Sequence, residues 1–405
     1  MVGNKLDTNY ILITSSNFPH GGAGANYLHL FCKGAKLQHY KIKVYLLKGF
    51  LFGNFSSNHK RKNITKEGIP FIYLGFVKRP NNTFYKFLDE LLSGINLLFK
   101  LISIVRNRKN TILLIYNNEL QYNILIYFFA EFFNIKLITF VPEFYGKYVF
   151  KGSFFRKLKW YGFLFNFYFL NKLSFKLIVF SHYLKDQYIS KGFKEADIIV
   201  QPNLTDFDFW EIQHCQQVYN LGYSGSPSIK DGLHDLFKAI SILKHRGVNI
   251  SLLVIGDSPF GHSLIPDLKI ECIRLGIDED INFSGLVELS MVKILLGQCG
   301  ILALTRPSTI QTQAGFPTKL GEYFASNKQV LVTNFGDIEK YFQNNIDVVM
   351  AQSGDVNEIA EKIQWMVDNK EHAEAIKLKG YKTAAALLEY KSSVKRIMNL
   401  CALDS

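Results

Sequence analysis

Short apolar runs alternate with amphipathic stretches along the first half of the chain. The runs YILITSS, KVYLLKG and TILLIYN have the length and composition of buried strands, and residues 84–105 have leucine and isoleucine at helical spacing. Alternation of strands and helices in this way is typical of a parallel sheet with helices on both faces. We therefore predict a doubly wound α/β domain over residues 1–205.

The pattern pauses after Pro202 in a turn-rich, acidic segment, QPNLTDFDFW, and starts again at the apolar run YNLGYSG. We predict a linker at 206–218, a second doubly wound domain at 219–385 and a terminal helical segment at 386–405. In open parallel sheets, ligands bind at the carboxyl ends of the strands. With two such domains, the expected site is a cleft between them.

The composition is that of a globular protein, with 405 residues of which 48% are hydrophobic and 20% charged. The five cysteines form no C-x-x-C pair, which favours a reducing cytosol over a disulfide-bonded secreted protein. The apolar runs are shorter than the ~20 residues that span a membrane, and the N-terminal residues lack the pattern of a signal peptide. We expect a cytoplasmic protein that is soluble or bound peripherally to a membrane.

The charge is distributed unevenly. Residues 1–205 contain 28 Lys and Arg against 10 Asp and Glu, a net charge of +18, whereas residues 206–405 contain 19 against 24, a net charge of −5. Residues 144–185 have no acidic side chain, and their Lys and Arg are interspersed with aromatic residues. Such a stretch is typical of a membrane-binding surface; the alternative is a helix with a buried aromatic face and a solvated basic side. We find no nucleic-acid recognition motif and expect no nucleic-acid partner.

Two strand-to-helix turns in the second half carry small residues and a lysine. The first, YSGSPSIKDG, has Gly225 and Ser226, which leave backbone N–H groups accessible to a phosphate, and Lys230, which adds a cation. An ordinary turn with a surface lysine is the alternative.

The second turn, GFPTKLGE, begins a predicted helix whose free N–H groups and dipole favour an anion. Lys319 adds a positive charge, and Glu322, one turn into the helix, is an acceptor suited to vicinal hydroxyls. A nucleoside diphosphate offers both groups; the alternative is a helix start with Glu322 present only for the dipole. The predicted binding segment comprises Gly315, Phe316, Pro317, Thr318, Lys319, Leu320 and Glu322.

Two features of the first half are candidates for the same cleft. The turn HGGAGAN supplies Gly21, Gly22 and Gly24; it lacks the G-x-G-x-x-G pattern of dinucleotide sites but allows a ligand to approach the backbone. Glu143 follows an apolar strand, so it is either a cleft residue or a solvated loop carboxylate. The ten histidines show no metal-binding spacing, and we expect no metal cofactor.

In this order and spacing, the motifs resemble the retaining, nucleotide-sugar-dependent glycosyltransferases of the GT-B class, known as group 1 or family four. The motifs are the glycine-rich first turn, IVFSHYLKDQY, VQPNLTDFDFW, YSGSPSIKDG and GFPTKLGEYFASNKQVLVTNFGD, and the resemblance covers nearly the whole chain. It implies two Rossmann-like domains facing a cleft, the first binding the acceptor and the second the donor. It also implies that the terminal helix returns toward the first domain.

The resemblance assigns roles to individual residues of the second domain. The family has an arginine and a lysine on the donor diphosphate; Lys230 matches the lysine, Ser226 stands at the usual arginine, and Arg306 is the candidate replacement. Glu322 matches the glutamate expected on the ribose hydroxyls.

A second family glutamate, eight residues before Glu322, is replaced by Ala314, and Gln311 or Gln313 is the candidate for its role. Glu143 falls near the acidic or histidine position that the family has on the acceptor side.

The resemblance implies transfer of a sugar, with retention, from a UDP- or GDP-sugar to a lipid-linked or glycan acceptor. The setting it implies is bacterial surface polysaccharide assembly at the inner face of the membrane. Lys230, Lys319 and Arg306 would stabilise the charge on the leaving diphosphate without a metal, and Glu143 would act on the acceptor side. The alternatives are a nucleotide-sugar epimerase of the same architecture and a non-catalytic sugar-nucleotide-binding subunit.

Overall fold

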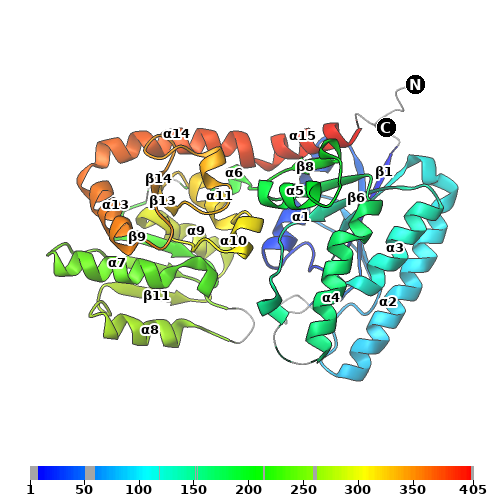
Figure 1. Ribbon diagram of the computed structural model, residues 1–405, viewed down its shortest axis with the longest axis horizontal. Coiled ribbons are helices and arrows are strands. Elements are labelled where there is room, and N and C mark those ends of the chain that lie inside the picture. The colour runs from blue at the N-terminus through cyan, green and yellow to red at the C-terminus, as the bar shows by residue number, and fades with distance from the viewer. Residues whose placement is uncertain are drawn as a thin grey trace. The chain divides into compact units, whose positions relative to one another are not determined.

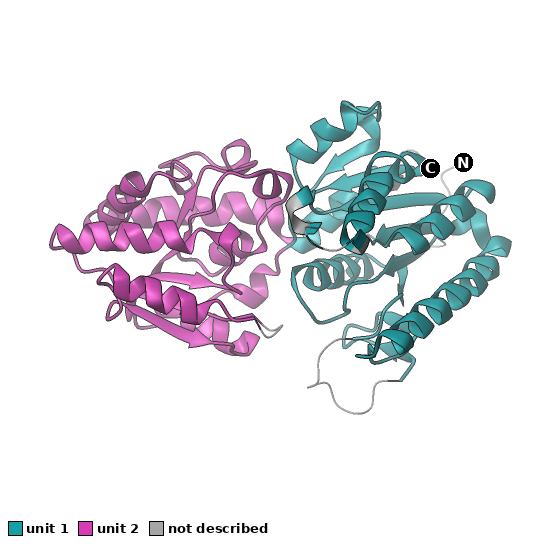
Figure 2. Cartoon of the chain, turned by 60° about the horizontal axis from the view of Figure 1, so that its bottom comes forward, with its two compact units in different colours: residues 1–204, 390–405 teal, residues 205–389 magenta. Residues whose placement is uncertain are grey.

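The structure is a computed structural model that describes residues 8–50, 60–117, 119–150, 152, 154–212, 215–258 and 262–402. The chain divides into two compact units, residues 1–204 with 390–405 and residues 205–389 (Figure 2). Each unit has a predominantly parallel sheet with helices on both faces, which confirms the predicted fold class of two doubly wound, Rossmann-like domains (Figure 1).

The first unit is built on an eight-stranded sheet. Its strands are β1 Asn9–Thr14, β2 Lys41–Leu46, β3 Lys62–Ile64, β4 Pro70–Tyr73, β5 Thr111–Tyr116, β6 Lys136–Val141, β7 Lys176–Val179 and β8 Ile198–Val200. They lie in the order β3-β4-β2-β1-β5-β6-β7-β8, and every pair is parallel except β3 with β4. The strand order reverses between β1 and β5, so a ligand of this unit is expected where these strands end.

Side chains of β1 alternate between two cores. Tyr10 and Leu12 pack with α1 (Ala23–Leu37) and α15 (Tyr390–Ala402) on one face. Ile11 and Ile13 pack with α2 (Thr83–Ile104) and α3 (Leu120–Phe132) on the other. Because both faces are covered, apolar side chains occupy nearly every strand position, which explains the continuous apolar runs in the sequence. The helical segments of this unit are α1 Ala23–Leu37, α2 Thr83–Ile104, η1 Val105–Asn110, α3 Leu120–Phe132, η2 Lys147–Phe150, α4 Phe154–Tyr168, η3 Leu170–Leu173, α5 His182–Ile189, η4 Glu195–Asp197 and α15 Tyr390–Ala402.

The basic stretch between residues 144 and 185 contributes α4 and β7. Arg156, Lys157 and Lys159 are exposed on α4, whereas Lys176 is buried in β7. The Lys176 ammonium donates to the Ala196 carbonyl at 2.9 Å. This lysine therefore stabilises the fold and does not contribute to an exposed basic surface. Lys151, also in this stretch, lies outside the described residues.

The second unit repeats the architecture with six strands in the order β11-β10-β9-β12-β13-β14. The strands are β9 Tyr219–Ser224, β10 Leu252–Ile255, β11 Ile281–Gly285, β12 Cys299–Leu304, β13 Gln329–Thr333 and β14 Val349–Ala351. The helical segments are α6 Phe207–Trp210, η5 Ile229–Asp231, α7 Leu233–His245, α8 Ile265–Arg274, α9 Leu289–Gly297, α10 Ile310–Ala314, α11 Thr318–Ala325, α12 Ile338–Tyr341, α13 Val356–Asp368 and α14 Lys370–Leu388. Side chains of β12 again alternate, with Ile301 facing the α7 and α13 core and Leu302 the α11 and α14 core.

The boundary between the units lies between Leu204 and Thr205. Residues 206–218, predicted as a linker, include α6, whose Phe207 and Trp210 are buried in the core of the second unit. The helix α14 extends to Leu388, three residues beyond the predicted end of the second domain at 385. The final helix, α15, then packs against α1 of the first unit.

No helix among the described residues is long and apolar enough to cross a membrane.

Candidate active site

The candidate site of the second unit lies where β9 and β12 end. These two strands are paired in the middle of the sheet, at the point where the strand order reverses. The turn after β9 leads through η5 into α7, and the turn after β12 leads through α10 into α11. Adjacent parallel strands bring their carboxyl ends to the same edge, so the two turns singled out in the sequence lie side by side.

A buried carboxylate, Asp231, joins the two turns. Its Oδ1 lies 2.9 Å from the ammonium of Lys319 and 2.9 Å from the guanidinium of Arg306, and its Oδ2 accepts from Ser228 Oγ at 2.6 Å. The side chain of Asp231 is 1% exposed. The structure therefore brings together two of the cations predicted from the sequence, Arg306 and Lys319, around an acidic residue that the sequence analysis missed.

The site retains a net positive charge. Burial by itself raises the pKa of Asp231, but the charges of Lys319 and Arg306 and the Ser228 hydrogen bond outweigh burial and hold that pKa well below its usual range. Burial lowers the pKa of Lys319 to about 8; Asp231 opposes this shift, while Arg306 and Lys230 add to it. Two cations thus share one anion, with Lys230 close enough to affect the charge of Lys319.

The path of the Lys319 side chain explains the small residue at position 225. Lys319 Nζ donates to Tyr223 Oη at 2.7 Å and lies 4.6 Å from the centre of that ring. A Cβ atom on Gly225 would lie 2.2 Å from Lys319 Cε, and Gly225 has a φ of +124°, which side chains disfavour. Gly225 therefore provides the space that Lys319 crosses. Ser226 next to it is exposed, and its carbonyl accepts from Tyr223 Oη at 3.3 Å.

The segment predicted to bind an anion connects α10 to α11. Phe316 is buried against Tyr341, with ring centres 6.0 Å apart, and Pro317 occupies the N-cap of α11, which has no side-chain cap. The remaining members of the predicted segment are Gly315, Thr318 and Leu320, of which Leu320 is in the core. The backbone N–H groups in the first turn of α11 therefore donate no hydrogen bond to the side chain of the N-cap residue.

Glu322 lies one turn into α11. Burial raises the pKa of Glu322 to about 7, and the charge of Lys319 partly opposes the shift. Of the two residues predicted to replace the missing glutamate, Gln313 donates from Nε2 to Ser308 Oγ at 3.3 Å, and both Gln311 and Gln313 are half-buried on α10. Ala314 itself is fully buried.

The candidates from the first half lie at the carboxyl edge of the first sheet. Gly22 is the N-cap of α1, and a Cβ atom on Gly24 would lie 2.8 Å from Tyr116 Oη at the end of β5. Gly21 is close to Asn17, where a Cβ atom would approach to 2.9 Å. Glu143 follows β6 and is half-buried. Burial raises the pKa of Tyr116, and the charge of Glu143 raises it further.

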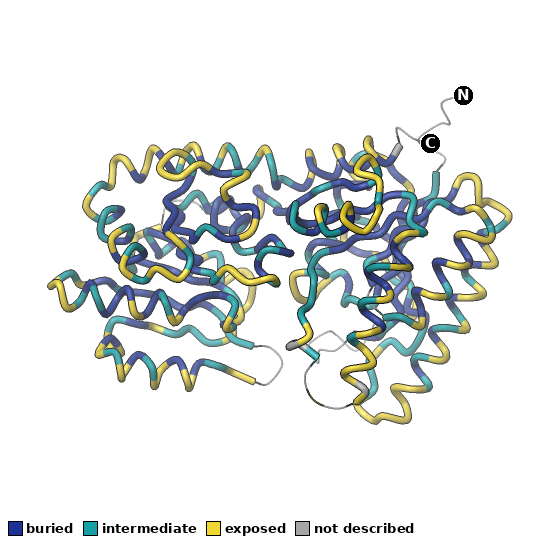
Figure 3. Tube along the Cα trace, in the orientation of Figure 1, coloured by how far each residue is buried: buried dark blue, intermediate teal, exposed yellow. Residues whose placement is uncertain are grey.

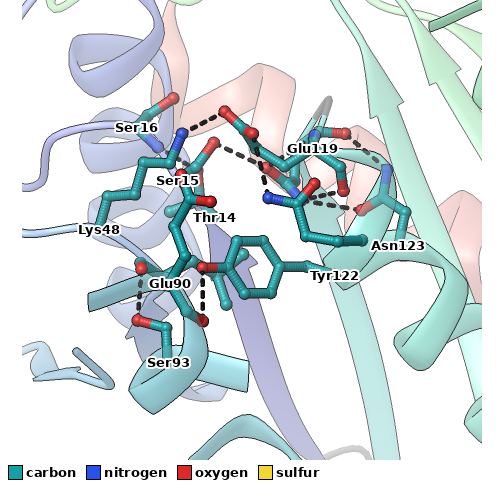
Figure 4. Close-up of polar contacts among 12 residues, drawn as sticks. Thr14, Ser15, Ser16, Lys48, Glu90, Ser93, Glu119, Tyr122 and Asn123 are labelled. Atoms are coloured by element: carbon teal, nitrogen blue, oxygen red, sulfur yellow. Dashed lines mark hydrogen bonds and ion pairs between the residues drawn. The ribbon is translucent and has the colours of Figure 1, made fainter. Parts of the chain in front are cut away.

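A polar cluster that the sequence analysis missed lies at the same edge of the first sheet (Figure 4). Lys48, after β2, forms an ion pair with Glu119, after β5. Ser15 donates to Asn117 Oδ1 at 2.7 Å, and Asn117 Nδ2 donates to Asn123 Oδ1 at 2.9 Å. Burial raises the pKa of Glu119, but the charge and hydrogen bond of Lys48 outweigh it and lower that pKa overall. Ser15, Lys48, Asn117 and Glu119 each come shortly after a strand end, which was the signal available in the sequence, whereas Asn123 lies in α3.

Among the residues that the structure describes, no group of three or more His, Cys, Asp or Glu side chains is arranged to hold a metal ion.

Two doubly wound units in one chain are what GT-B glycosyltransferases have, and the comparisons that follow confirm the resemblance noted in the sequence. Residues 205–383, which lie in the second unit, match the model of the family described as "Glycosyl transferases group 1". No curated protein matches the chain significantly.

Several solved structures share the fold. Anabaena Alr3699/HepE in complex with UDP-glucose is 15% identical, with a TM-score of 0.70, over 97% of this chain and 99% of that chain. A glycosyltransferase from Rickettsia africae ESF-5 is 16% identical, with a TM-score of 0.73, over 97% and 98%. Sucrose-phosphate synthase from Thermosynechococcus elongatus is 12% identical, with a TM-score of 0.70, over 97% and 98%.

Proposed function

We propose that the protein is a glycosyltransferase that moves a sugar from a UDP-sugar to an acceptor bound by the first unit. The observation that carries the proposal is the pair of cations, Arg306 and Lys319, held at 2.9 Å from buried Asp231 at the edge of a group 1 glycosyltransferase domain. HepE, which shares the fold, has been solved with UDP-glucose, which supports a uridine nucleotide. A GDP-sugar is the alternative donor.

The proposed chemistry concentrates on the leaving group. When the bond between the anomeric carbon and the phosphate oxygen breaks, negative charge grows on the diphosphate. Lys319, Arg306 and Lys230 would stabilise that charge together with the first N–H groups of α11, and a metal is not required for this role. Arg306 thereby supplies the second cation that Ser226 does not. Asp231 acts as a positioning residue, because it holds two cations in place before the donor binds.

Retention follows if the acceptor attacks from the face that the diphosphate leaves. The acceptor oxygen forms the new bond to the anomeric carbon, and its proton passes to the departing phosphate oxygen, so no protein nucleophile is needed. Glu322 would accept hydrogen bonds from the ribose hydroxyls. On the acceptor side, the proposed contacts are Gly21, Gly22, Gly24 and Glu143.

We further propose that the acceptor is lipid-linked or a glycan, and that the protein works at the inner face of a bacterial membrane in surface polysaccharide assembly. The exposed Arg156, Lys157 and Lys159 of α4 support binding to an anionic membrane surface. They lie in a first half whose net charge is +18.

A panel of UDP- and GDP-sugars tests the donor. A ligand at 100 times its Kd adds ~2.7 kcal/mol to stability, so the true donor should raise the melting temperature. The anomeric proton of the transfer product, read by NMR, then tests retention. If no nucleotide sugar stabilises the protein or is consumed, the proposal is wrong. Binding without turnover would favour the non-catalytic subunit, and conversion of the sugar without transfer would favour the epimerase.

A further inference from the structure

The first unit exposes large apolar side chains on three neighbouring helices. Monomeric soluble proteins rarely expose contiguous apolar patches of this kind, and such patches mark binding surfaces. Many residues of these helices, α2, α3 and α4, are coloured as exposed in Figure 3. The exposed fraction is, for example, 82% for Phe132 on α3 and 74% for Phe154 on α4. On α2 the exposed members are Phe84, Tyr85, Phe87, Leu91, Leu92, Ile95, Leu98, Phe99 and Ile102.

A groove of about 860 Å³ lies between α2, α3 and α4. This volume is within the range of roughly 300–1,000 Å³ typical of small-molecule sites. Its walls are mainly apolar and include Leu91, Ile95, Leu98, Leu120, Leu125 and Phe163.

Two glycines keep the groove open. Gly94 on α2 and Gly162 on α4 both line it, although glycine weakens a helix interior. A Cβ atom on Gly94 would meet no atom of the described residues within 4 Å, so a side chain at this position would project into free space. A Cβ atom on Gly162 would lie 3.2 Å from Leu120 Cδ2. Larger residues at these two positions would therefore narrow the groove.

The groove also has polar lining. Glu119 is both a wall residue and a member of the polar cluster at the carboxyl edge of the first sheet, where it pairs with Lys48 (Figure 4). Lys159 lines the groove as well and is close enough to lower the pKa of Glu119. The charged side chains that line the groove are thus one cation, Lys159, and two carboxylates, Glu90 and Glu119, of which Glu119 is paired with Lys48. The groove reaches the sheet edge at which we propose that the acceptor binds. Such a site fits an amphiphile with a long hydrocarbon chain and an anionic head group.

We propose that this groove binds the hydrocarbon chain of a lipid-linked acceptor, with the acceptor's phosphate beside Lys159. The proposal rests on the proposed glycosyltransferase function and selects the lipid-linked acceptor over a free glycan. Charge complementarity supports this occupant at the α4 wall of the groove, because Lys159 lines it and Glu119 is already neutralised by Lys48. Arg156 and Lys157, outside the groove on the same helix, add to the positive charge near Lys159, and α4 has no acidic residue. The exposed apolar faces of α2 and α3 border the groove and would allow the chain to pass directly from a membrane.

Displacement of a fluorescent dansyl-undecanoic acid from the full-length protein tests the groove without requiring any turnover. We expect n-dodecyl phosphate to displace the probe and n-butyl phosphate to fail. Each further buried methylene should tighten binding up to about fourfold. Equal displacement by both phosphates, or by neither, would overturn the proposal.

Gly94→Leu places a side chain in the groove and should weaken probe binding at least tenfold. The substitution favours helix formation, so the fold should be retained. Ser103→Leu is the matched control, because Ser103 is exposed on α2 outside the groove, and its probe binding should match the native protein. Native probe binding by Gly94→Leu would overturn the proposal, as would binding to anionic vesicles without any binding of dodecyl phosphate. If no nucleotide sugar stabilises the protein or is consumed, the proposed glycosyltransferase function is wrong. Displacement of the fluorescent probe does not depend on that function and would still test the groove.

Discussion

At the scale of single residues, Asp231 determines how much positive charge the site presents. It neutralises one of the two cations that contact it and fixes the positions of both. A cluster that is already ordered has little reorganisation to undergo when the diphosphate charge develops, which is the condition under which electrostatic stabilisation is most effective.

Replacement of Asp231 by Asn should strongly destabilise the protein. The variant keeps the shape of the side chain but leaves Lys319 and Arg306 buried together without a counter-charge. Breaking a buried pair in this way typically costs about 3–5 kcal/mol, measured here as the free energy of unfolding in urea. Asp280→Asn is the control: Asp280 pairs with partly exposed Lys244 at 2.8 Å, so we expect a loss of no more than ~1 kcal/mol. Equal effects would contradict the central role of Asp231.

The lysines should affect catalysis more than stability. Loss of one contact to the developing charge typically lowers the rate by roughly 10²–10³, and we expect this for Lys319→Ala and Lys230→Ala. Glu322→Ala should instead weaken donor binding, because its hydroxyl contacts are the same in the ground and transition states. Steady-state kinetics with the true donor, together with melting curves, separates these effects. Near-native turnover in both lysine variants would show that the diphosphate binds elsewhere.

The pH dependence of kcat/KM should be bell-shaped, because this quantity reports groups of the free enzyme. Activity should rise as pH passes about 7, where Glu322 loses its proton and becomes the better acceptor. Activity should fall as pH passes about 8, where Lys319 loses its charge. Glu322→Gln should remove the acid limb, and Lys319→Arg the alkaline limb, since arginine stays protonated. A flat profile across this range would rule out both assignments.

At the scale of elements, the turn after β9 and the start of α11 are matched to each other. Gly225→Ala should displace the flexible end of Lys319, because the added Cβ would lie 2.2 Å from Lys319 Cε. We expect turnover to fall about as far as in Lys319→Ala while the fold is retained. Gly285→Ala is the control, since Gly285 also has a positive φ, +66°, but in the part of the chain that the structure describes no atom lies within 4 Å of the added Cβ. If the two variants lose activity equally, backbone strain rather than Lys319 explains the effect.

The sequence was sufficient to predict the strands and the two turns, because buried parallel strands are continuously apolar and turns carry small residues. It was not sufficient to predict that Asp231 contacts cations from both turns. Asp231 and Arg306 are 75 positions apart in the sequence, and only the pairing of β9 with β12 brings them together. Periodicity predicted the helix at 84–105, but an apolar face does not reveal whether protein covers it. Charge in the sequence likewise does not reveal whether a basic side chain is exposed. Lys176 belongs to the basic stretch at 144–185, yet it is buried in the fold.

For the whole molecule, the uneven charge has a consequence at a membrane. The first half carries a net charge of +18, and three of its cations are exposed on α4 beside an apolar surface. Apolar contact and attraction to anionic lipid would therefore act on the same face and reinforce each other.

Co-sedimentation with vesicles should show binding to anionic lipid that weakens with salt. Each Lys or Arg near an anionic surface contributes ~1 kcal/mol, and the Debye length falls from about 10 Å at 0.1 M salt to about 3 Å at 1 M. Substituting both Arg156 and Lys157 by Gln should therefore weaken binding about tenfold to thirtyfold. The same change at Lys379 and Lys382, which are exposed on α14 of the second unit, should have little effect, because that half has a net charge of −5. Equal binding to neutral and anionic vesicles, or equal losses in the two double variants, would show that the basic face of α4 does not direct the protein to a membrane.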